Sequence, residues 1–151
     1  MTESKYIWMD GEFTPWNEAK VHVLSHTLHY GNGAIEGTKA YKTVDGRCAI
    51  FKLNEHTQRL LNSSKMTLMN VPFTLEELNK AQVELLQKNE LTNGAYIRPL
   101  VYLGYGVMGL YHKDAPVKVS ISAWEWGAYL GEEGLKKGVR VKISSFTRTP
   151  N

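Results

Sequence analysis

Three histidines are the first residues whose spacing could support chemistry. His22, His26 and His29 are spaced i, i+4, i+7, so a continuous helix would carry all three imidazoles on one face. Three imidazoles with one open position can hold zinc. However, no cysteine or carboxylate joins them at metal-ligand spacing, and Gly31 and Gly33 follow at once. We therefore expect no metal site, and we expect the histidines to make hydrogen bonds that fix a loop.

The glycines of the same stretch form a second candidate. Gly31, Gly33 and Gly37 give the pattern G-x-G-x-x-x-G, in which the third glycine comes one position too late for a dinucleotide fingerprint. The pattern also precedes a predicted strand, whereas a pyrophosphate needs the N-terminus of a helix. Two interpretations remain open: the glycines let the backbone approach a ligand or a partner subunit closely, or they form a plain tight turn.

Two arginines could bind anions. Arg59 lies within a predicted helix, in EHTQRLL, where the stem of an arginine usually covers the core, although a guanidinium there could also grip a phosphate. Arg98 lies in AYIRPLVY, and it shares one face of a predicted strand with Tyr96. This pair could recognise a carboxylate, or Arg98 could pair with an acid at an interface; the residues alone leave both interpretations open.

Aromatic residues gather toward the C-terminus. Trp124, Trp126 and Tyr129 end a predicted strand and enter a glycine-containing loop, where they could line a pocket for an apolar side chain or belong to the core. The sequence contains no nucleophile elbow, no phosphate-binding P-loop and no metal cluster with suitable spacing. The residues therefore predict a pocket or an interface and do not name a reaction.

The composition sets outer limits. The 151 residues fit one domain, with 42% hydrophobic and 22% charged residues. The net charge of +3 is mild and its basic residues are scattered, so we expect no nucleic-acid partner. Without a long apolar run or a signal peptide, we expect no membrane association. We expect the side chain of the single cysteine, Cys48, to be buried as a small apolar group. A single cysteine cannot form an internal disulfide, which fits a reducing compartment, and we expect a cytoplasmic protein.

Local signals predict the elements that must position these residues. Asp10-Gly11 and Asp45-Gly46 predict two hairpins, the second between strands 38–44 and 47–53. Asn54 is expected to cap a helix that runs to Leu68. The apolar face of that helix is predicted to contain Leu60, Leu61, Ser64 and Leu68. Thr74 and Glu77 form a capping box for a second helix, whose core-facing stripe is predicted to be Leu75, Leu78, Ala81, Gln82, Leu85 and Leu86.

The remaining segments are predicted to be strands. They cover 95–104, 117–123 and 139–145, and a glycine-rich and aromatic loop follows the first of them. Pro99 removes a backbone donor, so its strand is expected at a sheet edge or near a bulge. The predicted fold class is α+β: a mainly antiparallel sheet with helices packed on one side.

Five motifs, taken in order, resemble one family. They are YIWMDGEF, AKVHVLSHTLHYGNGAIEGTKAY, EHTQRL, AYIRPLVY and WGAYLG. Together they resemble the N-terminal domain of branched-chain amino-acid aminotransferases, which are fold-type IV pyridoxal-phosphate enzymes. The resemblance runs from about Tyr6 to Asn151. It is less specific for the substrate, because D-amino-acid transaminases and aminodeoxychorismate lyases share the architecture.

The resemblance implies roles for particular residues. Arg59 would hold the cofactor phosphate, Tyr96 would lie near the substrate carboxylate, and Arg98 would accept the acidic side chain of glutamate. The pocket for a branched side chain would be lined by Gly37, Trp126, Tyr129 and Ile35, where Ile35 replaces a phenylalanine found in many bacterial members. Tyr30 and Leu110 would reach into the neighbouring subunit's site, which implies a homodimer or a higher homo-oligomer. Glu36 and the histidines would support the structure.

The family's catalytic residues are not in this chain. The lysine that forms the Schiff base and the acid that pairs with the cofactor's ring nitrogen would both lie beyond Asn151. Residues 1–151 would thus be the small N-terminal domain, and a second, lysine-bearing domain would be absent from this chain. The parent protein would exchange amino groups between branched-chain L-amino acids and 2-oxoglutarate using pyridoxal 5'-phosphate, with amino acids and 2-oxo acids as its partners. The chain alone would bind no cofactor and have no activity.

Other functions remain open at this stage. Within the same family, the parent could be a D-amino-acid transaminase or resemble an aminodeoxychorismate lyase. Outside it, the chain could be a binding or interaction domain without catalysis, because a fold does not fix a function.

Overall fold

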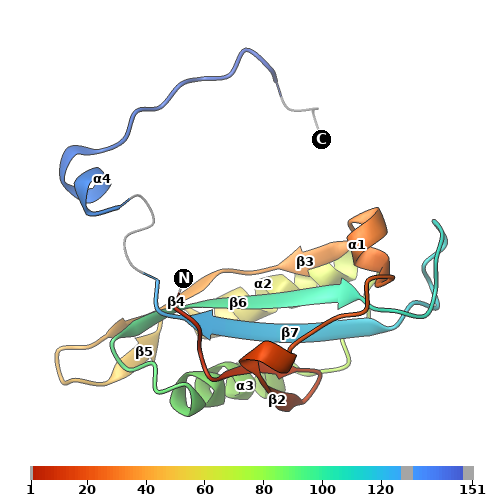
Figure 1. Ribbon diagram of the computed structural model, residues 1–151, viewed down its shortest axis with the longest axis horizontal. Coiled ribbons are helices and arrows are strands. Elements are labelled where there is room, and N and C mark those ends of the chain that lie inside the picture. The colour runs from red at the N-terminus through yellow and green to blue at the C-terminus, as the bar shows by residue number, and fades with distance from the viewer. Residues whose placement is uncertain (1, 127–130, 148–151) are drawn as a thin grey trace.

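The computed structural model describes residues 2–126 and 131–147 (Figure 1). Its centre is a seven-stranded sheet in the order β2-β1-β7-β6-β4-β5, with β3 also paired to β6. Every strand pair is antiparallel. The strands are β1 (Tyr6–Met9), β2 (Glu12–Pro15), β3 (Gly33–Ile35), β4 (Thr38–Lys42), β5 (Cys48–Ile50), β6 (Gly94–Leu103) and β7 (Val117–Trp124).

Two long helices cover one face of this sheet. They are α2 (Leu53–Met66) and α3 (Leu75–Lys88), which contact each other and the strands β1, β3, β6 and β7. Three short helices complete the described chain: η1 (Trp16–Glu18), α1 (His26–Tyr30) and α4 (Gly131–Lys137). The predicted α+β fold with helices packed on one side is therefore confirmed (Figure 1).

The core lies between the sheet and the two long helices. Alternate residues of the central strands point into it, such as Ile97 and Val101 of β6 and Ile121 of β7, all 0% exposed. The helix α3 adds most of the predicted stripe: Leu78, Ala81, Gln82, Leu85 and Leu86 are buried, whereas Leu75 in the first turn is only half-buried. Burying this much apolar surface is the main force that holds helices to sheet.

Two local predictions are confirmed by their geometry. In the first hairpin, Asp10 and Gly11 have φ angles of 49° and 106°, and both central residues of this turn type need positive φ. At the start of α3, the side chain of Thr74 accepts from the backbone N–H of Glu77, and the Glu77 carboxylate accepts from the N–H of Thr74. This reciprocal pair is the predicted capping box.

The start and end of α2 differ from the prediction. The helix begins at Leu53 after Lys52 in the left-handed conformation, and Asn54 lies inside it and accepts a hydrogen bond from Asn79 instead of capping the helix. Leu68 follows the helix with φ of 59° and is 81% exposed, so it does not belong to the apolar face. The apolar contacts of this end come from Met69 instead, which is 2% exposed.

Pro99 does not lie on an edge strand, because β6 pairs with β7 on one side and with β3 and β4 on the other. The carbonyl of Pro99 accepts from the backbone N–H of Glu36, at the place where β3 ends and β4 has not yet begun. In an antiparallel strand the N–H and C=O of one residue point to the same side. The pairs Ile35–Leu100 and Thr38–Ile97 keep the same register on both sides of this interruption, so no extra residue forms a bulge. The donor that Pro99 lacks falls in the gap between β3 and β4, and the prediction of a sheet edge or a nearby bulge was wrong.

The predicted strand at residues 139–145 is wrong. This segment has no regular structure, and its alternate apolar side chains are exposed, with Val141 at 83% and Ile143 at 92%. It runs apart from the sheet after α4, a helix that the sequence patterns did not predict (Figure 1). Alternation indicates a strand only when a sheet edge is available to pair with it. Among the described residues, no helix is long and apolar enough to cross a membrane.

Candidate active site

The sheet has one face that no long helix covers. Residues of β6 alternate between buried ones that face the helices and partly exposed ones that face the other way, and the second set contains Tyr96 and Arg98. The register adds Trp124, opposite Tyr96, and Ser122, opposite Arg98. We call this side of the sheet the open face.

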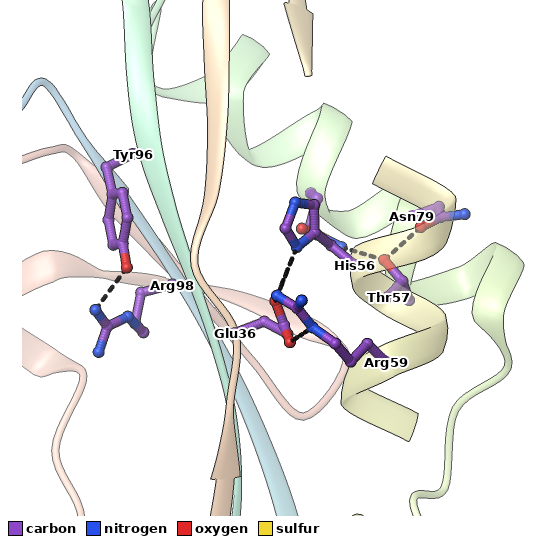
Figure 2. Close-up of polar contacts among 8 residues, drawn as sticks. Glu36, His56, Thr57, Arg59, Asn79, Tyr96 and Arg98 are labelled. Carbon is purple, nitrogen blue, oxygen red and sulfur yellow. Dashed lines mark hydrogen bonds and ion pairs between the residues drawn. The ribbon is translucent and has the colours of Figure 1, made fainter. Parts of the chain in front are cut away.

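Tyr96 and Arg98 form a pair on the open face. Arg98 Nη2 donates to Tyr96 Oη at 2.6 Å (Figure 2). Arg98 Nε is buried and has no hydrogen-bond partner, and no carboxylate of the described residues pairs with this guanidinium. A buried donor without a partner has a substantial free-energy cost, which an anionic ligand could remove. Two interpretations of Arg98 were open: it could bind a carboxylate ligand, or it could pair with an acid at an interface. No acid among the described residues pairs with it.

Aromatic rings surround Tyr96. Its ring centroid lies 4.6 Å from that of Trp126 in an edge-on arrangement and 5.2 Å from that of Trp124. Aromatic pairs at such distances restrict each other's motion and add packing free energy. The predicted aromatic wall therefore lies beside the Tyr96–Arg98 pair. Tyr129, predicted to belong to the same wall, lies outside the described residues.

Gly37 makes room for Tyr96. A Cβ atom at this position would lie 2.2 Å from Tyr96 Oη and 3.0 Å from Tyr96 Cζ. The backbone at Gly37 is closely approached, but by a side chain of the same chain, and not by the ligand or partner subunit that the first interpretation named. Gly31 fits the turn interpretation instead, because it ends α1 with a φ of 74°. Glycine is therefore required at Gly37 by the lack of space for a side chain, and it is favoured at Gly31 by the positive φ angle.

We expect Gly37→Ala to displace the Tyr96 ring and to break its hydrogen bond with Arg98. The flanking tryptophans limit where the ring can go, so the overpacking should lower the free energy of unfolding by about 1–2 kcal/mol. Urea denaturation of the variant and of the unsubstituted protein measures this difference.

Removing the Tyr96 hydroxyl provides the control. If the clash is with Oη, Gly37→Ala should cost less stability in a Tyr96→Phe background than in the original protein. Equal costs in the two backgrounds would show that the clash does not occur.

Glu36, next to Gly37, points to the other side of the strands (Figure 2). Its side chain is only 6% exposed, and it accepts from Arg59 Nε at 2.5 Å, from Arg59 Nη2 at 2.8 Å and from His56 Nδ1 at 2.9 Å. Burial alone would raise the pKa of Glu36, but hydrogen bonds and charge from Arg59 and His56 outweigh it and lower the pKa below its ordinary value of 4.5. We call Glu36, His56 and Arg59 the Glu36 cluster.

A buried polar network fixes the helix that carries Arg59. Thr57 of α2 donates to Asn79 Oδ1 at 2.6 Å and accepts from Gln82 Nε2 at 3.0 Å, and both partners belong to α3 (Figure 2). Thr57 and Gln82 are each 1% exposed. Buried hydrogen bonds of this kind specify one arrangement of two helices. The position of Arg59 is therefore set by α2 and α3 together.

We expect the Glu36 cluster to stabilise the fold at neutral pH and to lose this effect in acid. A carboxyl with a lowered folded pKa stabilises above its unfolded pKa, and this contribution disappears as the pH falls through the folded pKa. Glu36→Gln should therefore reduce the free energy of unfolding by about 1–2 kcal/mol at pH 7. Near pH 3 the difference should shrink toward zero.

Urea denaturation at several pH values tests this expectation. Glu55→Gln is the matched control, because Glu55 forms an exposed ion pair with Lys52 and should matter little for stability. A Glu36→Gln penalty that stays constant from pH 7 to pH 3 would contradict the assigned role of its charge.

Tyr30 and Leu110 lie together at the far end of β6, away from Tyr96. Tyr30 Oη accepts from the backbone N–H of Gly109 at 3.1 Å, and His26 Nε2 makes a hydrogen bond with the carbonyl of Gly109 at 2.8 Å. Two side chains of α1 thus hold both backbone groups of one glycine, which has a φ of 106°. The next residue, Leu110, is held in an 87% exposed position.

The three histidines do not share one helical face, because α1 is short and begins at His26. His26 holds Gly109, His29 Nε2 contacts the carbonyl of Val23 at 2.9 Å, and His22 Nδ1 accepts from the N–H of Leu24 at 3.1 Å. Each histidine therefore fixes loop backbone, as the hydrogen-bonding interpretation predicted. Among the residues that the structure describes, no group of three potential ligands could hold a metal ion.

The structure brings most, but not all, of the predicted site residues together. Gly37, Tyr96, Arg98 and Trp126 meet on the open face, and Ile35, 56% exposed, lies on the same face opposite Leu100. Arg59 lies on the helical side, and Tyr30 and Leu110 lie at another end of the sheet. The sequence patterns did not single out His56; its i, i+3 spacing to Arg59 was the available signal.

Comparisons with known proteins agree on one family. The model for "Amino-transferase class IV" matches residues 33–151. A branched-chain-amino-acid aminotransferase of Pseudomonas aeruginosa is 49% identical over 142 residues, which cover 94% of this chain and 46% of that protein. The branched-chain amino acid aminotransferase of Escherichia coli has a crystal structure that matches with a TM-score of 0.91 at 42% identity, over 99% of this chain and 49% of that one.

A third match is a structure solved with a ligand. The branched-chain amino acid aminotransferase of T.th., complexed with N-(5'-phosphopyridoxyl)-L-glutamate, has a TM-score of 0.79 at 44% identity, over 86% of this chain and 43% of that one. The chain thus spans about half the length of the curated relatives it matches.

Proposed function

This chain belongs to the class IV aminotransferase family, and on that premise we propose that residues 1–151 form the small N-terminal domain of a pyridoxal-phosphate transaminase. The complete enzyme exchanges amino groups between branched-chain L-amino acids and 2-oxoglutarate. A second domain beyond residue 151 supplies the catalytic lysine and the acid that pairs with the cofactor's ring nitrogen. The 151-residue chain alone is then inactive.

The observation that carries this proposal is the Tyr96–Arg98 pair. Arg98 has a buried Nε without a partner, and no carboxylate of the described part of the chain pairs with it. A planar guanidinium with free donors suits a carboxylate, which accepts two parallel hydrogen bonds. Both substrates of the proposed reaction carry carboxylates, and glutamate carries a second one for Arg98 to accept.

The open face also suits an apolar side chain. Ile35 and Trp126 offer apolar surface, and Gly37 makes room for the Tyr96 ring in the same region; Tyr129 is proposed to join them. Apolar walls with a few well-placed polar groups are typical of small-molecule sites. In this arrangement Tyr96 and Arg98 orient the substrate, and the surrounding rings exclude water from it.

Arg59 is the residue proposed to hold the cofactor. The cofactor fits it because Arg59 is 64% exposed and its Nη1 has no partner within the described residues, although Nε and Nη2 are held by Glu36. Both N–H groups of Nη1 and the second N–H of Nη2 therefore remain outside the contact with Glu36, and they can face a phosphate. When bound, pyridoxal 5'-phosphate supplies an electron sink for the carbanion at the substrate α-carbon.

We also propose a homodimer or a higher homo-oligomer in the cytoplasm. The apolar surface of α1 and the loop after β6 is exposed, with Leu28 at 62%, Leu110 at 87% and Tyr111 at 72%. Exposed apolar patches of this kind mark interfaces. In the proposed assembly, Tyr30 and Leu110 reach the neighbouring subunit's site. The single cysteine is consistent with a reducing compartment.

Substrate profiling tests the proposal. The full gene product, extended beyond residue 151 to its natural stop codon, is assayed with 2-oxoglutarate and L-leucine, L-valine or D-alanine. We expect turnover with both L-amino acids. Turnover of D-alanine alone would point to a D-amino-acid transaminase, and a stop codon directly after residue 151 would favour a binding domain without catalysis.

A further inference from the structure

The Glu36 cluster joins a buried carboxylate to an exposed cation. Glu36 is 6% exposed at its side chain, whereas Arg59 is 64% exposed. The buried carboxylate therefore holds one end of a side chain whose other end is open to solvent. Besides stabilising the fold, this arrangement leaves part of the guanidinium available to a ligand.

The contacts of Glu36 define the orientation of the Arg59 side chain. One carboxylate oxygen accepts from Nε and the other from Nη2, so the carboxylate holds one edge of the guanidinium (Figure 2). Because the guanidinium is planar and rigid, fixing this edge also fixes the direction of its remaining N–H groups, which belong to Nη1 and Nη2. No described residue makes a hydrogen bond with Nη1.

Glu36 is itself well fixed. Its backbone N–H donates to the carbonyl of Pro99 at 3.0 Å, and His56 contacts the same carboxylate oxygen that accepts from Arg59 Nη2. Gly37, the next residue, is in close contact with Tyr96 on the open face. The carboxylate thus stands on the sheet, at the junction between the region of Arg59 and the region of the Tyr96–Arg98 pair.

We propose that Glu36 is the positioning residue for Arg59 and directs its free Nη1 edge toward the phosphate group of the cofactor. This inference rests on the proposed function, in which Arg59 binds that phosphate. The charge of Glu36 opposes the binding of an anion, because it offsets the positive charge of Arg59. Its contribution is therefore the direction of the guanidinium, and His56 supports it by holding the carboxylate.

Two substitutions of Glu36 test whether it acts by orienting the Arg59 guanidinium or by its negative charge. Glu36→Asp keeps the negative charge but shortens the side chain, and Glu36→Gln keeps the length but removes the charge. If Glu36 positions Arg59, both variants should bind pyridoxal 5'-phosphate roughly tenfold more weakly, the equivalent of one charge-assisted hydrogen bond. If Glu36 acted only through its charge, Glu36→Asp would bind normally and Glu36→Gln more tightly.

The binding experiment uses the full gene product, stripped of cofactor and titrated with pyridoxal 5'-phosphate or with pyridoxal, which lacks the phosphate. We expect the Glu36 variants to lose affinity for the phosphorylated compound only. Arg59→Ala is the control that separates the two claims. If it binds pyridoxal 5'-phosphate normally, the phosphate role of Arg59 fails; if it binds weakly while both Glu36 variants bind normally, only the positioning role fails.

Nuclear magnetic resonance of the unsubstituted 151-residue chain gives a readout that needs neither activity nor a stable Glu36 variant. The Arg59 Nε–H signal is assigned by its loss in Arg59→Lys. We expect this proton to exchange with water much more slowly than that of Arg140, which is exposed. Equal exchange rates for the two arginines would show that Glu36 does not hold the guanidinium and would overturn the inference.

Discussion

Arg98→Ala is expected to reduce kcat/KM for L-glutamate about 100-fold in the full gene product, with a much smaller effect on L-leucine. Losing two charge-assisted hydrogen bonds to a carboxylate should cost about 3 kcal/mol of binding free energy, which corresponds to this factor. Leucine has no side-chain carboxylate for Arg98 to bind. Steady-state kinetics with the two amino donors, each at several concentrations, measures both effects.

Arg98→Lys is the matched variant for this prediction. Lysine keeps the positive charge but lacks the planar fork, so glutamate should be used better than in Arg98→Ala and worse than in the original enzyme. Equal losses for glutamate and leucine in Arg98→Ala would count against a role for Arg98 in binding the side-chain carboxylate.

Arg59→Ala is expected to weaken the binding of pyridoxal 5'-phosphate about 100-fold and to leave the binding of pyridoxal unchanged. The substitution removes the charged donors from the phosphate and leaves the rest of the pocket in place. Equilibrium titration of the cofactor-free gene product, followed by absorbance, measures both affinities.

Arg47→Ala controls for the loss of a positive charge. Arg47 is also exposed, and it pairs with Asp45 in the loop before β5, so its removal should not affect either ligand. Normal affinity for pyridoxal 5'-phosphate in Arg59→Ala would remove Arg59 from the phosphate site.

Signals within a few residues predicted their elements well. The Asp10-Gly11 turn needs positive φ at both positions, and the Thr74–Glu77 box satisfies the first free N–H groups of α3, so each signal sets its own geometry. The segment 139–145 shows the limit of such patterns. Its alternation is typical of a strand, but a strand also needs a partner, and the sequence of the segment does not say whether one is available.

The same limit applies to the candidate site. Tyr96 and Arg98 lie two residues apart in one strand, so their shared face followed from strand geometry alone. Glu36 and Arg59 are 23 residues apart, and their contact depends on how α2 packs against the sheet. From the residues, Arg59 was expected to cover the core with its stem; the structure instead shows a guanidinium held at one edge and open at the other.

The most direct test of the proposed function compares two proteins, this chain and the full gene product. Each is incubated with pyridoxal 5'-phosphate, reduced with borohydride to fix the cofactor on its lysine, and mapped by peptide mass. We expect only the longer protein to carry the cofactor, on a lysine beyond residue 151. Labelling of neither protein, or of a lysine within residues 1–151, would contradict the proposal that this chain is the first domain of a pyridoxal-phosphate transaminase.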